Sequence, residues 1–168
     1  LLGTAKILYA MRGEFEGTVK LLFQPAEEKA PGGASIMIQD GALQNPIPSG
    51  ILGQHVAPNI PVGKIGFREG MYMASADELY LTVKGKGGHG AMPHRAADPI
   101  VAAASLVMAL QTVVSRNVDP LHTAVVTVGS IHSGKANNVI PASAQLELSV
   151  RALDPAVRRL LEQRIKSL

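Results

Sequence analysis

Apolar residues recur at helical spacing in three stretches of the chain. Residues 1–11 form the first stretch, and Gly13 follows where a helix C-cap glycine stands. Before the second and third stretches, Asp98-Pro99 and Asp154-Pro155 each combine an N-cap residue with a first-turn proline. The predicted buried faces of these two helices are Ala103, Leu106, Val107, Leu110, Val113 and Val114, and then Val157, Leu160, Leu161, Ile165 and Leu168.

The first part of the chain alternates helical patterns with short apolar runs. The runs at 17–23 and 49–56 are rich in strand-forming residues, and residues 34–43 between them predict a short helix. Helix and strand in alternation favour an α/β layer with a mostly parallel sheet. Residues 57–70 are rich in proline and glycine, which predicts a turn-rich connection with one short strand at 64–67.

The pattern changes after residue 76. Residues 78–84 and 145–151 alternate apolar with polar side chains, as half-exposed strands of an antiparallel sheet do, and 123–131 is rich in β-branched residues. The order strand, helix, strand, strand, helix is that of a ferredoxin-like unit without its last strand. We therefore predict part of an α/β domain over residues 1–72 and a ferredoxin-like α+β domain over residues 73–168.

Composition narrows the possible functions. Apolar residues make up 46% of the 168 residues, the formal charge is +3, and aromatic residues are 4%. Scattered basic residues and few aromatic side chains argue against nucleic-acid binding. The longest apolar run, 99–114, is shorter than a membrane span, so no membrane partner is expected. The chain has no cysteine, which is compatible with a reducing compartment, and we expect a cytoplasmic protein.

Two carboxylates and a histidine follow the predicted parallel strands. Glu27 and Glu28 come directly after Pro25, which ends the run at 17–23, and His55 stands near the end of the run at 49–56. Adjacent side chains on an extended backbone point in opposite directions, so one carboxylate could hold a metal while the other turns toward a water. Metal-assisted hydrolysis needs such a pair, although two solvated glutamates opening a loop remain the alternative.

A glycine-rich segment follows the first strand of the second predicted domain. Gly85, Gly87 and Gly90 have the spacing of the dinucleotide fingerprint, and His89 lies among them. In a nucleotide site the helix opens directly on the glycines, whereas here it is expected only at Asp98. A nucleotide-binding domain therefore stays a lesser alternative. His94, His122 and His132 are expected on the surface, Asn138 in a loop between strands, and Arg151 on the polar face of its strand.

Four segments together resemble one family in order and spacing. They are Phe23-Gln24-Pro25-Ala26-Glu27-Glu28, the Gly-x-His-x-x-Pro around His55, Gly87 to His94, and Asn138-Val139-Ile140-Pro141 followed by Arg151. The chain resembles the metal-dependent amidohydrolases that include aminoacylases, hippurate hydrolase, auxin-conjugate hydrolases and glutamate-releasing carboxypeptidases. Gln54 departs from the leucine expected before the ligand histidine, and Leu148-Ser149 from a Gly-Thr-like pair.

The resemblance implies roles for six residues. Glu27 would be the general base, Glu28 and His55 metal ligands, and His89 the group that stabilises the oxyanion in a neighbouring subunit's site. Asn138 and Arg151 would hold the substrate, and Arg151 would bind the substrate's carboxylate. The implied reaction is hydrolysis of hippurate-like N-acyl amino acids to a carboxylic acid and an amino acid.

The resemblance also implies domain roles, cofactors and partners: residues 1–72 would be part of a catalytic α/β domain, and residues 73–168 an inserted lid that forms the dimer interface. Two divalent ions for each full-length subunit are expected (zinc, manganese, cobalt or nickel), together with a homodimer formed through the lid. The family's first metal-binding segment should precede Leu1 and its last histidine ligand should follow the lid, so we expect this chain alone to be inactive. A non-catalytic dimerisation module is the alternative from another class of function.

Overall fold

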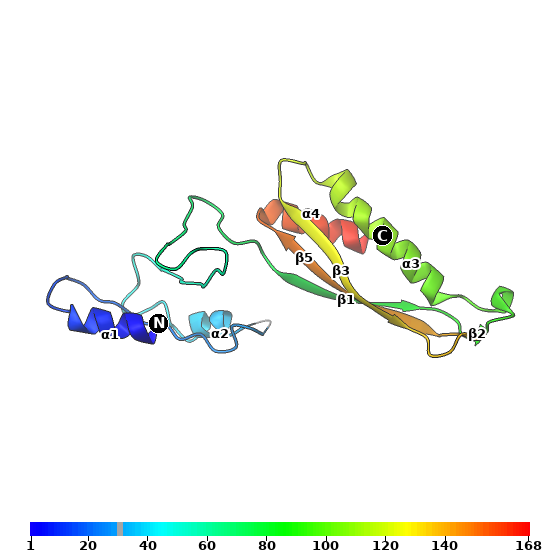
Figure 1. Cartoon of the computed structure of the whole chain (residues 1–168), viewed down its shortest axis with the longest axis horizontal. Helices are drawn as coiled ribbons and strands as arrows, with labels where there is room; N and C mark the ends of the chain where they lie inside the picture. Colours follow the sequence, from blue (N-terminus) through cyan, green and yellow to red (C-terminus); the bar gives the residue numbers. More distant parts are fainter. Residues whose placement is uncertain (30–31) are drawn as a thin grey trace. The chain divides into compact units, whose positions relative to one another are not determined.

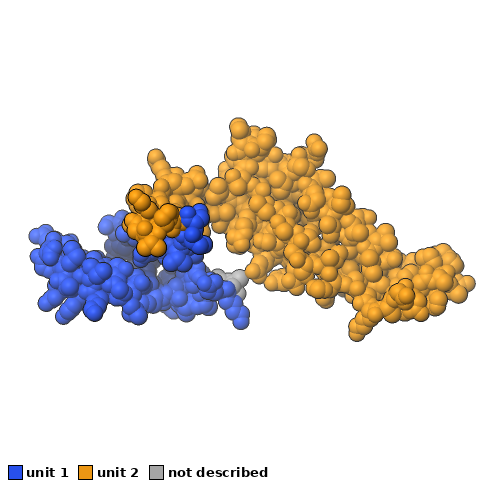
Figure 2. Space-filling view, in the orientation of Figure 1, with its two compact units in different colours: residues 1–59 blue, residues 60–168 orange. Residues whose placement is uncertain are grey.

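The structure is a computed structural model, and it describes residues 1–29 and 32–168. The chain divides into two compact units, residues 1–59 and residues 60–168, which Figure 2 shows in two colours. The boundary predicted at 72/73 lies beyond this division and close to the start of the first strand. Each unit is described by itself.

The first unit contains two short helices joined by irregular chain. They are α1, Leu2–Ala10, and α2, Ala34–Gln39, so the first predicted helix is confirmed and the second ends earlier than its apolar pattern indicates. No apolar side chain described in residues 1–59 is buried, and Leu52 is fully exposed. These residues therefore build no hydrophobic core of their own.

The strands predicted over 17–23, 49–56 and 64–67 are not formed. In the described part of the chain the first strand begins at Asp77, and all the strand pairs are antiparallel. A strand exists only with a hydrogen-bonded neighbour, and these apolar runs have none among the described residues. The prediction of a parallel sheet in this unit is corrected accordingly.

The second unit is a three-stranded antiparallel sheet covered by two helices (Figure 1). The strands are β1 (Asp77–Lys84), β3 (Ala124–Ser133) and β5 (Ser143–Ala152), in the order β1-β5-β3. The helices are α3 (Pro99–Asn117) and α4 (Pro155–Lys166). This is the predicted order of strand, helix, strand, strand, helix, so the ferredoxin-like part of the fold prediction is confirmed.

Caps and alternation explain these elements. The Asp98 carboxylate accepts hydrogen bonds from the amides of Ile100 and Val101, and the Asp154 carboxylate from the amide of Ala156. Each aspartate thus satisfies amides that lack partners inside the helix that it begins. In β5 every second residue is buried, which places one face of the sheet against the helices and the other in solvent.

The core lies between this sheet and the two helices. Side chains from β3, β5, α3 and α4 make it, and all are at most 8% exposed: Ala103, Leu110, Val113, Val126, Ala144, Leu146, Leu148, Val150, Ala152, Val157, Leu161 and Ile165. Most of them were predicted as buried faces. The core fixes the sheet and, through it, the loops at its two ends.

Beyond the lower right end of this sheet in Figure 1, two short strands form a separate ribbon. They are β2 (Gly88–His89) and β4 (Val139–Ile140), which pair antiparallel, and a 3₁₀ turn, η1 (Pro93–Arg95), follows β2. The sequence did not predict this ribbon because two-residue strands have no periodicity to detect. We call the segments 85–98 and 134–142 the tip of the unit.

The α3 helix extends beyond the apolar run at 99–114 to 19 residues, and it is the one helix in the described ranges that is long and apolar enough to cross a membrane by length and composition. Core helices of globular domains meet the same criterion. One side of α3 packs in the core through Ala103, Leu110 and Val113, which accounts for much of its apolar character.

Candidate functional site

The Glu pair lies in a tight turn of the first unit. Ala26, directly before the pair, has a φ of 51°, and the amide of Gly33 donates to the carbonyl of Pro25 at 3.0 Å. A Cβ atom at Gly33 would come within 2.6 Å of Pro25, so this close approach requires glycine. Left-handed backbone at a residue other than glycine is uncommon, and the instances that exist cluster at functional sites. The turn holds Glu27 and Glu28 at the surface, and both are exposed.

His55 is exposed, and its ring has a defined tautomer. Its Nδ1 lies 2.6 Å from the carbonyl oxygen of Val56. A carbonyl only accepts hydrogen bonds, so Nδ1 carries a proton, and in the neutral form of the ring Nε2 keeps its lone pair. A neutral imidazole in this state is suited to bind a cation through Nε2.

His89 has the opposite tautomer. Its Nδ1 accepts a hydrogen bond of 3.1 Å from the backbone amide of Ala91. An amide only donates, so Nδ1 is unprotonated and the neutral ring carries its proton on Nε2. The exposed Nε2–H group is therefore a hydrogen-bond donor, as a residue that stabilises an oxyanion must be.

Close backbone contacts fix His89 beside Asn138. The Gly90 amide donates to the Asn138 carbonyl at 2.7 Å, and a Cβ at Gly90 would lie 3.1 Å from the Asn138 backbone. In the β2–β4 pair His89 stands opposite Val139. The tip thus brings together two of the predicted site residues, His89 and Asn138.

Arg151 does not join them. It lies near the end of β5, opposite Val125, whereas Asn138 lies beyond the start of that strand at Ser143. The ten residues of β5 span about 30 Å at the rise of an extended chain. Within one copy of the unit, Asn138 and Arg151 therefore cannot hold the same carboxylate.

Arg151 lies instead beside the segment that enters the sheet. Ala152, the residue after Arg151, exchanges hydrogen bonds with Ser75. The Ser75 amide donates to the Ala152 carbonyl at 2.8 Å, and the Ala152 amide donates to the Ser75 hydroxyl. Asp77 lies two residues after Ser75, and both of its carboxylate oxygens accept hydrogen bonds from Arg158. These hydrogen bonds lower the pKa of Asp77, since they stabilise its charged form. The entry to β1 is thereby held to β5 and α4.

The described residues do not fit a complete metal centre. No group of three or more His, Cys, Asp or Glu side chains among residues 1–29 and 32–168 could hold an ion. Glu28 and His55 are two candidate ligands, and a catalytic zinc-type site needs at least three from protein. The predicted roles of Glu27, Glu28 and His55 stay predictions.

The glycines of the nucleotide-like motif have a different explanation here. A Cβ at Gly85 would overlap the carbonyl oxygen of Ala97, and one at Gly87 would lie 3.0 Å from that of Ile140. The glycines let strands of the tip pass close together, and α3 begins only at Pro99, well after them. The site lacks the strand-to-helix turn that a dinucleotide pyrophosphate binds.

A shallow pocket beside His89 was not anticipated from the sequence. Its lining combines the loop from Ser133 to Asn137 with Ile100 and Val139, and its volume is about 360 Å³. No signal in the sequence indicates it, because the pocket depends on the contact between the start of α3 and a loop some thirty residues later.

Comparisons with known proteins agree with this fold. The peptidase dimerisation domain family, M20_dimer, matches residues 75–168. An N-acetyldiaminopimelate deacetylase of Priestia megaterium is 43% identical over 167 residues, which are 99% of this chain and 44% of that protein. An N-acetyl-L-cysteine deacetylase of Bacillus subtilis is 44% identical over 98% of this chain and 39% of its own length. The chain thus spans less than half the length of these curated relatives.

Two solved structures are similar over nearly the whole chain. One is a protein of methicillin resistant Staphylococcus aureus that is provisionally described as an aminohydrolase. Its TM-score is 0.84, and it is 42% identical over 99% of this chain and 44% of its own length. The Bacillus subtilis YXEP protein, described as a dinuclear metal binding peptidase from the M20 family, has a TM-score of 0.63 and 36% identity over 98% of this chain and 42% of its own. The match over residues 75–168, more than half of the chain, shows that it belongs to the M20 family of peptidase dimerisation domains.

Proposed function

We propose that the full-length protein carrying this chain is an amidohydrolase that cleaves the amide bond of N-acyl amino acids. The single observation that carries the proposal is His89, whose Nε2–H is an exposed donor fixed by the Ala91 amide. Hydrolysis of an amide passes through a tetrahedral oxyanion, and a positioned donor lowers the barrier to it. The deacetylase names of two relatives over 40% identical support the reaction class.

The other residues take roles consistent with this reaction. Glu27, exposed on its turn, would deprotonate the attacking water, and Asn138 and Arg151 would bind the substrate. Divalent metal is part of the proposal, with Glu28 and His55 as two of its ligands, and the printed description of the YXEP protein supports it. The identity of the ions, the hippurate-like acyl group and the cytoplasmic location stay predictions.

Hydrolysis of N-acetyl, N-benzoyl and N-succinyl amino acids by the full-length protein tests the proposal. We expect release of free amino acid, loss of turnover after dialysis against a chelator, and recovery with an added divalent ion. This chain alone should release none, since its described residues lack a complete metal centre. Absence of turnover with every acyl group and every metal would rule the proposal out. The non-catalytic dimerisation module would then be the better account.

We also propose that the protein is a homodimer and that the exposed face of α3 lies in the interface. Residues 99–115 carry no charged side chain, and Val101 and Met108 on that face are 63% and 70% exposed. The hydroxyls of Ser105, Thr112 and Ser115 donate to carbonyls of the helix itself, which leaves them little need for water. An uncharged face of this kind is suited to pack against a second copy, and the family's description as a dimerisation domain supports the same partner.

Met108→Glu should shift the purified chain from dimer to monomer, because it places a charge in the proposed apolar interface. Sedimentation equilibrium over a range of concentrations measures the shift. Leu121→Glu is the matched control, since Leu121 is 91% exposed and lies outside α3. Equal dimer stability of the two variants would place the interface elsewhere.

The proposed dimer also accounts for the distance between Asn138 and Arg151. In a two-fold symmetric dimer, each copy contributes one tip and one Arg151. One site could therefore take His89 and Asn138 from one subunit and Arg151 from the other. Each substrate would then be held across the interface rather than within one copy.

A further inference from the structure

We propose that the pocket beside His89 is a subsite for the side chain of the substrate's amino acid, and that Lys135 binds a carboxylate at the end of that side chain. The preferred substrates would then be N-acyl amino acids with an aliphatic, acid-terminated side chain. This inference rests on the proposed function and adds a specificity-determining residue to it.

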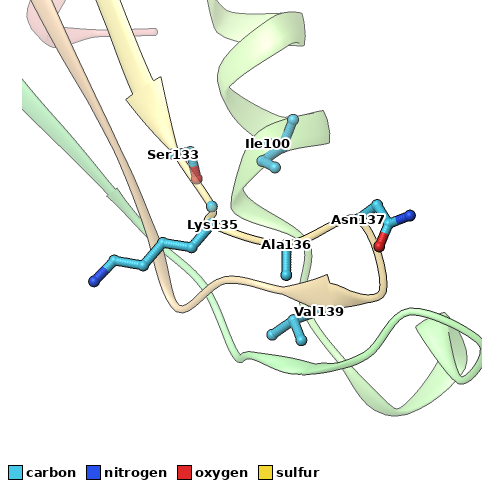
Figure 3. A pocket seen from close by; sticks show the side chains of 7 residues that line it. Ile100, Ser133, Lys135, Ala136, Asn137 and Val139 are labelled. Carbon is cyan, nitrogen blue, oxygen red and sulfur yellow. The ribbon is translucent and has the colours of Figure 1, made fainter.

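The lining of the pocket matches such a side chain. Figure 3 shows Ile100, Ala136 and Val139 near the middle, with Lys135 and Asn137 extending to opposite sides. Ile100 is 44% and Val139 53% exposed, so both present apolar surface that a bound ligand would cover. An apolar middle with polar groups at its ends is complementary to a chain of methylenes that ends in charge.

The pocket lies next to the reacting group. His89 and Val139 stand directly opposite in the antiparallel β2–β4 pair, and side chains of such a pair point to the same face of the ribbon. Their Cβ atoms are therefore about 5 Å apart. A substrate whose carbonyl oxygen accepts from His89 would have its neighbouring atoms at Val139, the wall of the pocket.

The charges of the tip favour an anionic ligand. Lys86, Arg95 and Lys135 are its three cations. Asp98, its one carboxylate, already accepts from two amides of α3. Lys135 has no ion pair in the part of the chain that the structure describes. An ammonium group without a local carboxylate can bind a ligand carboxylate with no competing ion pair to break.

The loop that carries Lys135 is held at both ends. The Ser133 hydroxyl donates to the Ser143 carbonyl at 2.7 Å, and the Asn138 carbonyl accepts from Gly90 at 2.7 Å. Between them Gly134 has a φ of +70°, a conformation that glycine adopts without strain. A loop fixed in this way loses little conformational entropy when it binds a ligand.

Three substrates separate the effect of charge from that of length: N-acetyl-L-2-aminoadipate, N-acetyl-L-norleucine and N-acetyl-L-alanine. In the full-length protein Lys135→Met, which keeps the methylenes, should raise KM for the aminoadipate derivative about fivefold, the upper range for an exposed ion pair. KM for the norleucine and alanine derivatives should stay unchanged. Lys64→Met is the control, because Lys64 is exposed, lies outside the tip and carries the same charge.

A binding measurement needs no turnover. Adding N-acetyl-L-2-aminoadipate to this chain should move the methyl NMR signals of Ile100 and Val139, and Lys135→Met should weaken that response while Lys64→Met leaves it unchanged. Equal KM changes for all three substrates, or no methyl shift, would overturn the subsite. Absence of turnover with all N-acyl amino acids would instead overturn the proposed function, so the two failures are distinguishable.

Discussion

Replacing His89 with alanine in the full-length protein is expected to lower kcat by about 10²–10³-fold, the effect of removing one oxyanion donor. The reason is the fixed tautomer: the Ala91 amide occupies Nδ1, which leaves Nε2–H to donate to the substrate oxygen. KM should change much less, because the donor acts on charge that develops in the transition state. Steady-state kinetics with an N-acetyl amino acid measures both constants.

His94→Ala is the matched control for this prediction. His94 is also an exposed histidine of the tip, but it lies in η1 and the structure gives its ring no backbone hydrogen bond among the described residues. Its loss should leave kcat within about twofold of wild type, as for an ordinary surface substitution. A kcat for His89→Ala that equals that of His94→Ala would show that His89 is not an oxyanion donor.

Mixing variants tests whether His89 and Arg151 serve one site from two subunits. An equal mixture of His89→Ala and Arg151→Ala subunits, unfolded and refolded together, should recover about one quarter of wild-type turnover, because half of the dimers are mixed and each has one intact site. If the two residues acted from the same subunit, the refolded mixture would be no more active than the two variants assayed separately.

Leu110→Ala is expected to lower the free energy of unfolding of the second unit by about 2–5 kcal/mol. Leu110 is fully buried between α3 and the sheet, so its truncation removes apolar contacts and leaves a cavity. Urea unfolding of the chain, followed by circular dichroism, gives the change. The loss is a large part of the stability of a domain of this size.

Leu121→Ala makes the same chemical change on the surface. Leu121 is 91% exposed, so its truncation should change stability by less than about 0.5 kcal/mol. Equal losses for the two leucines would mean that the sheet and α3 do not pack as the structure has them.

Sequence patterns predict the second unit well because its elements satisfy local rules. The Asp98 and Asp154 caps mark the starts of α3 and α4, and the alternation over residues 145–151 marks β5 and its buried face. Each of these signals is contained within a few neighbouring residues, and the sheet pairs elements that are all in the described part of the chain.

The apolar runs of the first unit mislead for the complementary reason. The runs at 17–23 and 49–56 have the composition of buried parallel strands, but the described residues offer them no neighbouring strand to pair with. Composition indicates what a segment requires, and whether it becomes a strand depends on residues far away. The tautomers of His55 and His89 were also beyond prediction, since each depends on one backbone atom at hydrogen-bond distance.

The tight backbone contacts of the tip have a consequence for motif searches. Gly85, Gly87 and Gly90 each face a neighbouring backbone that leaves little or no room for a Cβ atom, so packing alone accounts for their spacing. A search for the string G-x-G-x-x-G would assign a dinucleotide cofactor to this protein and to any homologue that keeps the same crossing. A search that also requires a helix to start at the third glycine would reject them, because here eight residues lie between Gly90 and Pro99.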